Sequence, residues 1–118
     1  MTLPIPQYHV QVCTTEVMPG KRVVEFKGLA RGNSIRTASL STDVVARMKN
    51  LVGGEIVEYT KILAECREEA IDRMIEHAHS LGANAVIGMR FCTSEVAPEA
   101  AELLAYGTAV LVEDQPPS

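Results

Sequence analysis

The chain has 118 residues, of which 47% are hydrophobic and 22% are charged, and its formal net charge is −4 at pH 7. This length suits one domain, and this hydrophobic fraction excludes wholesale disorder. No run of Lys or Arg exceeds two residues, which disfavours nucleic acid and anionic membranes as partners because both require a concentrated basic surface. We therefore expect a single domain over residues 1–118, with its core within residues 8–113.

Cysteine usage and the N-terminal residues indicate the cellular compartment. Three cysteines are too few and too far apart for a disulfide framework. The first residues carry neither the cationic nor the apolar segment of a secretory signal, and no apolar run approaches the roughly 20 residues that cross a bilayer. These features predict a cytoplasmic protein.

Aromatic residues make up only 4% of the chain, and there is no Trp. Aromatic side chains bury more surface per residue than others in small cores, so a monomer of this composition would have a thin core. We expect additional burial between subunits of an oligomer. A core filled by aliphatic side chains alone is the simpler alternative.

The N-terminal part predicts two strands, at residues 8–14 and 22–30, because polarity alternates along both. Between them, Met18–Lys21 has Pro and Gly at the positions that a type II turn requires. The two strands are therefore expected to form a hairpin. Residues 31–34 have the composition of a loop.

Two helices are expected next, at residues 43–52 and 55–81. Ser41 or Thr42 can cap the first helix, and a glycine pair ends it. The second helix ends at Gly82 and carries an apolar stripe at helical spacing. The stripe consists of Tyr59, Leu63, Cys66, Ala70, Met74, His77 and Leu81.

The C-terminal part predicts strands at residues 84–93 and 101–112, separated by a loop at residues 94–100. Residues 114–118 are expected to be a frayed tail. The predicted order is β-β-α-α-β-β. It indicates an α+β fold in which one long helix packs on an antiparallel or mixed sheet.

Common enzyme signatures are missing from the chain. Gly53-Gly54 is followed by Glu-Ile-Val rather than by the Lys-Ser or Lys-Thr of a phosphate-binding loop. The pair Gly28 and Gly32 lacks the third glycine and the helix of a dinucleotide site. Neither a Gly-x-Ser-x-Gly elbow nor a His-x-x-x-His pair occurs. We expect no catalytic activity.

Metal binding is the next possibility, because cysteine and histidine are ligands for soft and borderline metals such as zinc or copper. The candidates are Cys13, Cys66, Cys92 and His77. Cys66 and His77 share a helix face but lie about 16 Å apart along it. A site must therefore join Cys66 to cysteines on the sheet, or take one residue from each subunit of a ring. The alternatives are structural: a buried thiol acts as a small apolar side chain, and a histidine near a helix C-terminus complements the dipole.

An anion site is the alternative to a metal site. Tyr59, Arg67 and Arg90 would supply convergent donors if an interface between subunits brought them together. Ion pairs between these arginines and glutamates across an interface are the simpler use of the same residues.

Four segments together resemble a known family: Gly53–Tyr59 with its glycine pair, Ala64–Ala70 with Arg67 at its centre, Leu81–Arg90 (LGANAVIGMR) and Tyr106–Val110 (YGTAV). In the same order and spacing, over about residues 9–113, they resemble the YbjQ family, which is described as "putative heavy-metal-binding". This resemblance implies an α+β subunit that assembles into a cyclic pentamer, sometimes doubled to a decamer, with strands contributing to sheets between subunits.

The resemblance does not supply a ligand set. The shared motifs are glycines, alanines and aliphatic residues, and none of the three cysteines belongs to them. In addition, Glu55 stands where many relatives have Arg after the glycine pair. Our first hypothesis is a cytoplasmic, non-catalytic homo-oligomer that binds a soft metal. The second is a structural or small-molecule-binding ring with pockets between subunits and no physiological metal.

Overall fold

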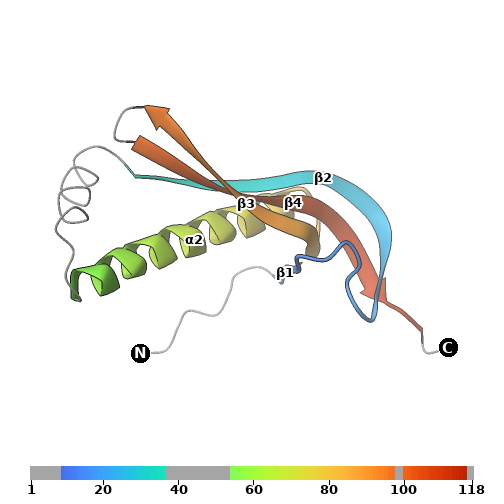
Figure 1. Ribbon diagram of the computed structural model, residues 1–118. Coiled ribbons are helices and arrows are strands. Elements are labelled where there is room, and N and C mark those ends of the chain that lie inside the picture. Colours follow the sequence, from blue (N-terminus) through green and yellow to red (C-terminus); the bar gives the residue numbers. More distant parts are fainter. Residues whose placement is uncertain (1–8, 37–53, 98–99, 117–118) are drawn as a thin grey trace.

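The structure is a computed structural model that describes residues 9–36, 54–97 and 100–116, with side chains within 9–35, 63–94 and 102–116. One helix lies across one face of a four-stranded mixed sheet with the strand order β1-β3-β4-β2 (Figure 1). The elements are β1 (Gln11–Val12), β2 (Lys21–Arg36), α2 (Gly54–Ser80), β3 (Ala85–Ala97) and β4 (Ala100–Asp114). The predicted α+β class and the packing of a long helix on a mixed sheet are confirmed.

The long helix agrees with its prediction to within one residue at each end. It ends in a Schellman motif, in which the Ala83 N–H donates to the Ala78 carbonyl (3.1 Å) and the Gly82 N–H donates to the His79 carbonyl (2.9 Å). Gly82 has a φ of +84°, which glycine adopts without strain. The helix predicted at residues 43–52 lies outside the described residues.

The predicted N-terminal hairpin is wrong. β1 pairs in parallel with β3, Gln11 with Ala85 and Val12 with Val86, whereas β2 pairs antiparallel with β4. The turn at Met18–Lys21 does form, because the Lys21 N–H donates to the Met18 carbonyl (3.1 Å) and Gly20 has a φ of +75°. It connects strands at opposite edges of the sheet. Alternating polarity identifies a strand but not its partner.

Both predicted loops are largely strand. Residues 31–34 continue β2 in register with residues 103–106 of β4, and β3 and β4 extend through most of residues 94–100. The turn-forming composition of Arg31–Ser34 is overridden by long-range pairing, since strand preference depends on context. At the other end of β4, Asp114 belongs to the strand rather than to a frayed tail. The hydrogen bond from Lys21 and the positive charge of Lys21 hold the pKa of the Asp114 carboxyl below its ordinary value.

The core lies between α2 and the sheet and is built from small side chains. The buried residues of this layer are Ala30, Ala70, Met74, Ala78, Ala83, Val86, Met89, Ala105 and Ala109. A second cluster lies on the opposite face of the sheet, because Ala85 and Val110 alternate with Val86 and Ala109 along their strands. Met18, which precedes β2, covers this second cluster together with Val112.

Two strand glycines allow backbones to approach closely. A Cβ at Gly32 of β2 would lie 2.2 Å from the Met74 nitrogen and 2.4 Å from the Ala70 carbonyl oxygen, so α2 rests directly on β2. A Cβ at Gly107 would lie 2.5 Å from a Val86 methyl group. Gly88 has a different role: its φ is +64° at the bulge in β3, and an added Cβ would meet nothing within 4 Å.

Replacing Gly32→Ala should therefore destabilise the fold by roughly 3 kcal/mol, since the added methyl group meets helix backbone that cannot rotate away. Urea unfolding followed by circular dichroism measures this change. Arg31→Ala, at an exposed neighbouring position, is the control and should change the free energy of unfolding by less than about 0.5 kcal/mol. Equal stabilities of the Gly32 variant and the wild type would contradict the close packing of α2 on β2.

Candidate functional site

The three cysteines lie on three different parts of the fold. Cys13 follows β1 and packs against the second cluster, on the sheet face away from α2. Cys66 lies on α2 and is 5% exposed, and Cys92 lies on β3 and is exposed. Within the residues that the structure describes, no three His, Cys, Asp or Glu side chains come close enough to hold a metal ion. One described chain does not by itself assemble the proposed ligand set.

His77 is engaged by the backbone of β2. Its Nδ1 accepts a hydrogen bond from the Arg31 N–H at 3.1 Å, so the neutral ring carries its proton on Nε2. Neither nitrogen then offers a free lone pair to a metal ion. Metal binding through His77 would require the bond to Arg31 to break.

His77 belongs to a row of three α2 residues, spaced four apart, that hold the edge of β2. We call Glu69, Arg73 and His77 the α2 clamp. Arg73 donates from Nη1 to the Asn33 carbonyl (2.6 Å) and pairs through Nη2 with Glu69 (2.9 Å). Glu69 also accepts a hydrogen bond from Ser34 Oγ at 3.3 Å. The clamp thus satisfies outward-facing backbone groups of β2 at Arg31 and Asn33.

Sequence reasoning missed this clamp. The pairing of Glu69 with Arg73 was visible as a favourable i,i+4 spacing, and His77 follows at the same interval. What the sequence did not show was that residues 31–34 form an edge strand whose backbone groups need partners.

A polar hollow of about 450 Å³ lies beside the clamp. It is lined by Arg31, Gly32, Asn33, His77, Glu102 and Leu104. Asn33 donates from Nδ2 to Glu102 at 3.1 Å, which ties β2 to β4 across the hollow. The hollow contains groups of both charges and a hydrogen-bond donor on His77, so its chemistry suits a polar ligand rather than a metal ion.

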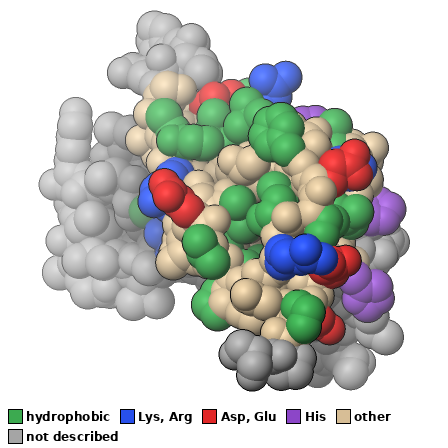
Figure 2. Space-filling model, turned by 90° about the vertical axis from the view of Figure 1, so that its right-hand side faces the viewer, with side chains coloured by type: hydrophobic (Ala, Val, Ile, Leu, Met, Phe, Trp, Pro, Cys, Tyr) green, Lys and Arg blue, Asp and Glu red, His purple; other side chains and the backbone are tan. Residues whose placement is uncertain are grey.

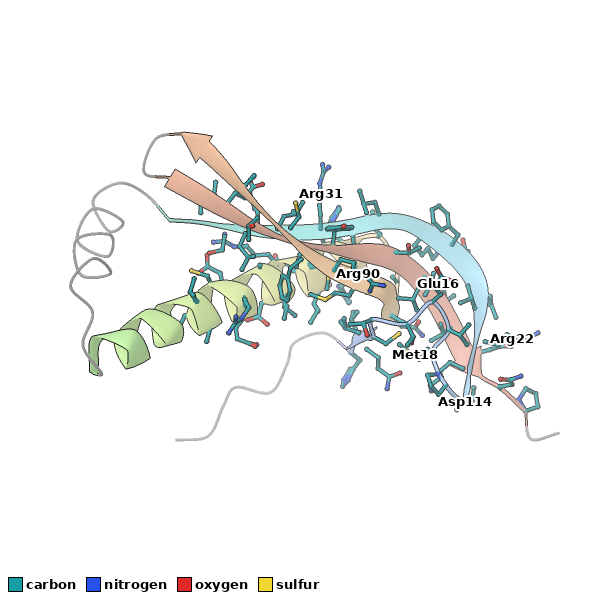
Figure 3. All side chains as sticks on the ribbon, viewed as in Figure 1. Glu16, Met18, Arg22, Arg31, Arg90 and Asp114 are labelled. Carbon is teal, nitrogen blue, oxygen red and sulfur yellow. The ribbon has the colours of Figure 1, made fainter. Side chains whose placement is uncertain are left out.

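The candidate anion ligands do not converge within one chain. Arg67 is exposed on α2, whereas Arg90 pairs in register with Tyr106, whose position alternates with the helix-facing Ala105. Arg90 therefore belongs to the opposite face of the sheet. Its Nη1 donates to the carbonyls of Thr14 and Met89, both at 2.8 Å, and the side chain reaches the segment after β1 (Figure 3). Tyr59 lies in α2, but its side chain is outside the described part.

The described residues thus define a small α+β subunit whose candidate ligand side chains lie on separate elements and on both faces of one sheet. The chain belongs to the YbjQ family: the family model described as "Putative heavy-metal-binding" matches residues 10–113. Among the described residues, no helix combines the length and the apolar character that a membrane span requires.

Relatives in archaea and bacteria carry the name UPF0145 protein. One from Thermococcus kodakarensis is 51% identical over 106 residues, covering 90% of this chain and 94% of the relative. Another from Clostridium perfringens is 52% identical over 103 residues, covering 87% and 97%. A third from Pyrococcus furiosus is 53% identical over 102 residues, covering 86% and 90%.

A solved structure shares the fold. It is a protein of unknown function from Pediococcus pentosaceus, described as a member of the DUF74 family. The TM-score is 0.57 at 17% identity, and the match covers 88% of this chain and 98% of that one. At this level of identity the similarity establishes the architecture alone.

The three thiols should differ in reactivity because their exposure differs. Cys92 should react first with a small maleimide under native conditions, Cys13 more slowly, and Cys66 on the order of 100-fold more slowly than Cys92, since a buried thiol is inert until the fold opens. Mass spectrometry of peptides from a time course measures each rate. Urea-unfolded protein is the control, in which the three rates should converge. Rapid labelling of Cys66 in the native protein would contradict the burial of this α2 side chain.

Proposed function

We propose that this protein is a non-catalytic, cytoplasmic homo-oligomer, a pentamer or decamer, that binds a soft metal ion such as zinc or copper between its subunits. The observation that carries the proposal is the separation of Cys13, Cys66 and Cys92 within the described chain. Side chains on opposite faces of one sheet reach a common ion when a second subunit contributes. The family description supports metal as the ligand class.

The elongated shape of the chain and an exposed apolar patch on its surface support assembly into an oligomer. The radius of gyration is 17.4 Å, whereas a compact chain of this length has about 13 Å. Apolar side chains gather where β2 and β4 curve away from α2 (Figure 2). Phe26 is 71% exposed there, and Val17, Val23, Val24 and Leu29 are exposed as well. An exposed apolar patch of this kind marks an interaction surface.

A second candidate function is binding of a small anion between subunits. It is favoured by the state of Arg67 and Arg90, which, like Arg31, form no ion pair within the described residues, whereas Lys21, Arg22, Lys27 and Arg73 do. Guanidinium groups that lack a carboxylate partner among the described residues are suitable ligands for a phosphate or carboxylate group.

Native mass spectrometry of untagged protein, purified without chelator and titrated with Zn²⁺ or Cu⁺, tests the proposal. We expect an oligomer with discrete, saturating metal adducts in proportion to its subunits. The variant combining Cys13→Ser, Cys66→Ala and Cys92→Ser should lose these adducts but keep its oligomeric mass.

Cys66→Ala alone is the matched control for repacking around this buried α2 position, and its circular dichroism should match that of the wild type. Unchanged metal uptake by the triple variant would contradict cysteine ligation. An oligomer with only non-saturating adducts would leave the anion-binding ring as the function, and a monomeric wild type would overturn both.

A further inference from the structure

The polar hollow beside the α2 clamp is a ligand-sized space that neither proposed function uses. Its volume of about 450 Å³ lies within the roughly 300–1,000 Å³ of small-molecule pockets. It lies at the outer edge of β2, where His77 reaches this strand from α2. Its described lining belongs to one chain, so the hollow exists without a metal ion and without a second subunit.

Two opposite charges line this hollow without pairing to each other. Arg31 and Glu102 are both part of the lining. Among the described residues, no ion pair joins these two side chains or engages Arg31 elsewhere. In the register of β2 with β4 their positions are four residues apart, which is about 13 Å along the strands. The two charges thus enter the hollow from different positions on the sheet.

Both charged side chains lie on the sheet face away from α2. Figure 3 shows Arg31 pointing away from the helix, and Glu102 and Leu104 alternate with the helix-facing Ala105. Asn33 donates from Nδ2 to Glu102 Oε2 at 3.1 Å, and Asn33 lies two positions nearer to Arg31. This bond fixes the carboxylate on the side of Arg31 and leaves Glu102 Oε1 without a partner among the described residues.

The α2 clamp fixes the wall of the hollow next to Arg31. His77 Nδ1 accepts the Arg31 N–H, and Arg73 donates to the Asn33 carbonyl. In the neutral ring of His77, Nε2 carries a proton, for which the described residues provide no acceptor. Because the backbone of this wall is already hydrogen-bonded, a ligand meets it without ordering it first, which lowers the cost of binding.

The chemistry of the lining selects the class of ligand. Glu102 disfavours a purely anionic ligand and Arg31 a purely cationic one, since like charges repel. An uncharged ligand would cover both charges without supplying a countercharge to either. The described residues also provide no group of three metal ligands. A neutral molecule that carries one charge of each sign satisfies both side chains.

Another hollow of the described chain shows the contrast. It has about 630 Å³ and lies along α2, where five carboxylates and the single Arg73 line it. A ligand with a carboxylate group would be repelled there. The balance of charges is therefore a property of the hollow at β2 and not of the surface in general.

We propose that the polar hollow binds a small zwitterion, a molecule with one carboxylate and one ammonium group. Arg31 and the Nε2–H of His77 bind the carboxylate, and Glu102 Oε1 accepts a hydrogen bond from the ammonium group. The half-buried Leu104 contacts the carbon chain of the ligand. Free amino acids and short peptides share this chemistry.

Binding of matched probes to the full chain, followed by NMR titration, tests the charge requirement. The probes are L-leucine, 4-methylpentanoate, which lacks the ammonium group, and 3-methylbutylamine, which lacks the carboxylate. We expect saturable shifts with L-leucine and about 10-fold weaker binding of the other two, since each lacks one charged hydrogen bond. The dipeptide glycyl-L-leucine distinguishes the sources: tighter binding than L-leucine assigns a peptide, and weaker binding assigns the free amino acid.

Variants of the two charged residues assign each charge to its partner. Arg31→Ala should weaken L-leucine about 10-fold and leave 3-methylbutylamine unchanged, because this amine has no carboxylate to lose. Glu102→Gln, which keeps an oxygen for Asn33, should weaken L-leucine as much and leave 4-methylpentanoate unchanged. Arg22→Ala, an exposed arginine of β2 that pairs with Glu113 outside the hollow, is the matched control and should bind L-leucine as the wild type does.

A merely structural role of either residue would weaken all probes alike, so this pattern separates recognition from loss of fold. Binding of 4-methylpentanoate as tight as that of L-leucine would overturn the proposal in favour of an anion site. Absence of saturable shifts with both L-leucine and the dipeptide would overturn it as well. Neither result bears on the metal adducts and the oligomeric mass that test the proposed function.

Discussion

The close contact between α2 and β2 is the constraint on which the rest of the structure depends. Because Gly32 has no side chain, the helix backbone lies within van der Waals distance of the strand. Only at this separation do Arg73 and His77 reach the carbonyl of Asn33 and the N–H of Arg31. The same contact therefore builds the core and seals one edge of the sheet.

The packing of α2 on the sheet also keeps the candidate metal ligands of one chain apart. Cys66 is buried on α2, whereas Cys13 lies on the far face of the sheet, and the bond from Arg31 occupies His77. This separation is the reason why we propose a metal site between subunits rather than within one chain. The thin core of alanines, with Met74 as one of its few large buried side chains, agrees with such an arrangement.

The sequence predicts local features of this fold well and long-range ones poorly. Helical periodicity located α2, and Gly20 and Gly82 marked the turn and the helix end, because these features depend on neighbouring residues. The partner of β1 and the strand character of Arg31–Ser34 depend on register with β3 and β4, which alternation and composition do not encode.

In the candidate site, too, the sequence predicts local features but not long-range contacts. Burial of Cys66 follows from its place on the apolar stripe, and the Glu69–Arg73 pair follows from helical spacing. The contact of His77 with β2 does not, because its partner is a backbone group 46 positions away. Likewise, Arg67 and Arg90 could be named from the sequence, but only the fold places them on opposite sides of the sheet.

Amide hydrogen exchange at Arg31, measured by NMR or mass spectrometry on the wild type and on His77→Ala, tests the central claim most directly. The account predicts slow exchange in the wild type, because His77 Nδ1 accepts the Arg31 N–H across the contact between α2 and β2. In His77→Ala the same amide should exchange about 10-fold faster. Fast exchange at Arg31 in the wild type would show that this edge of β2 is open to water and would contradict the account.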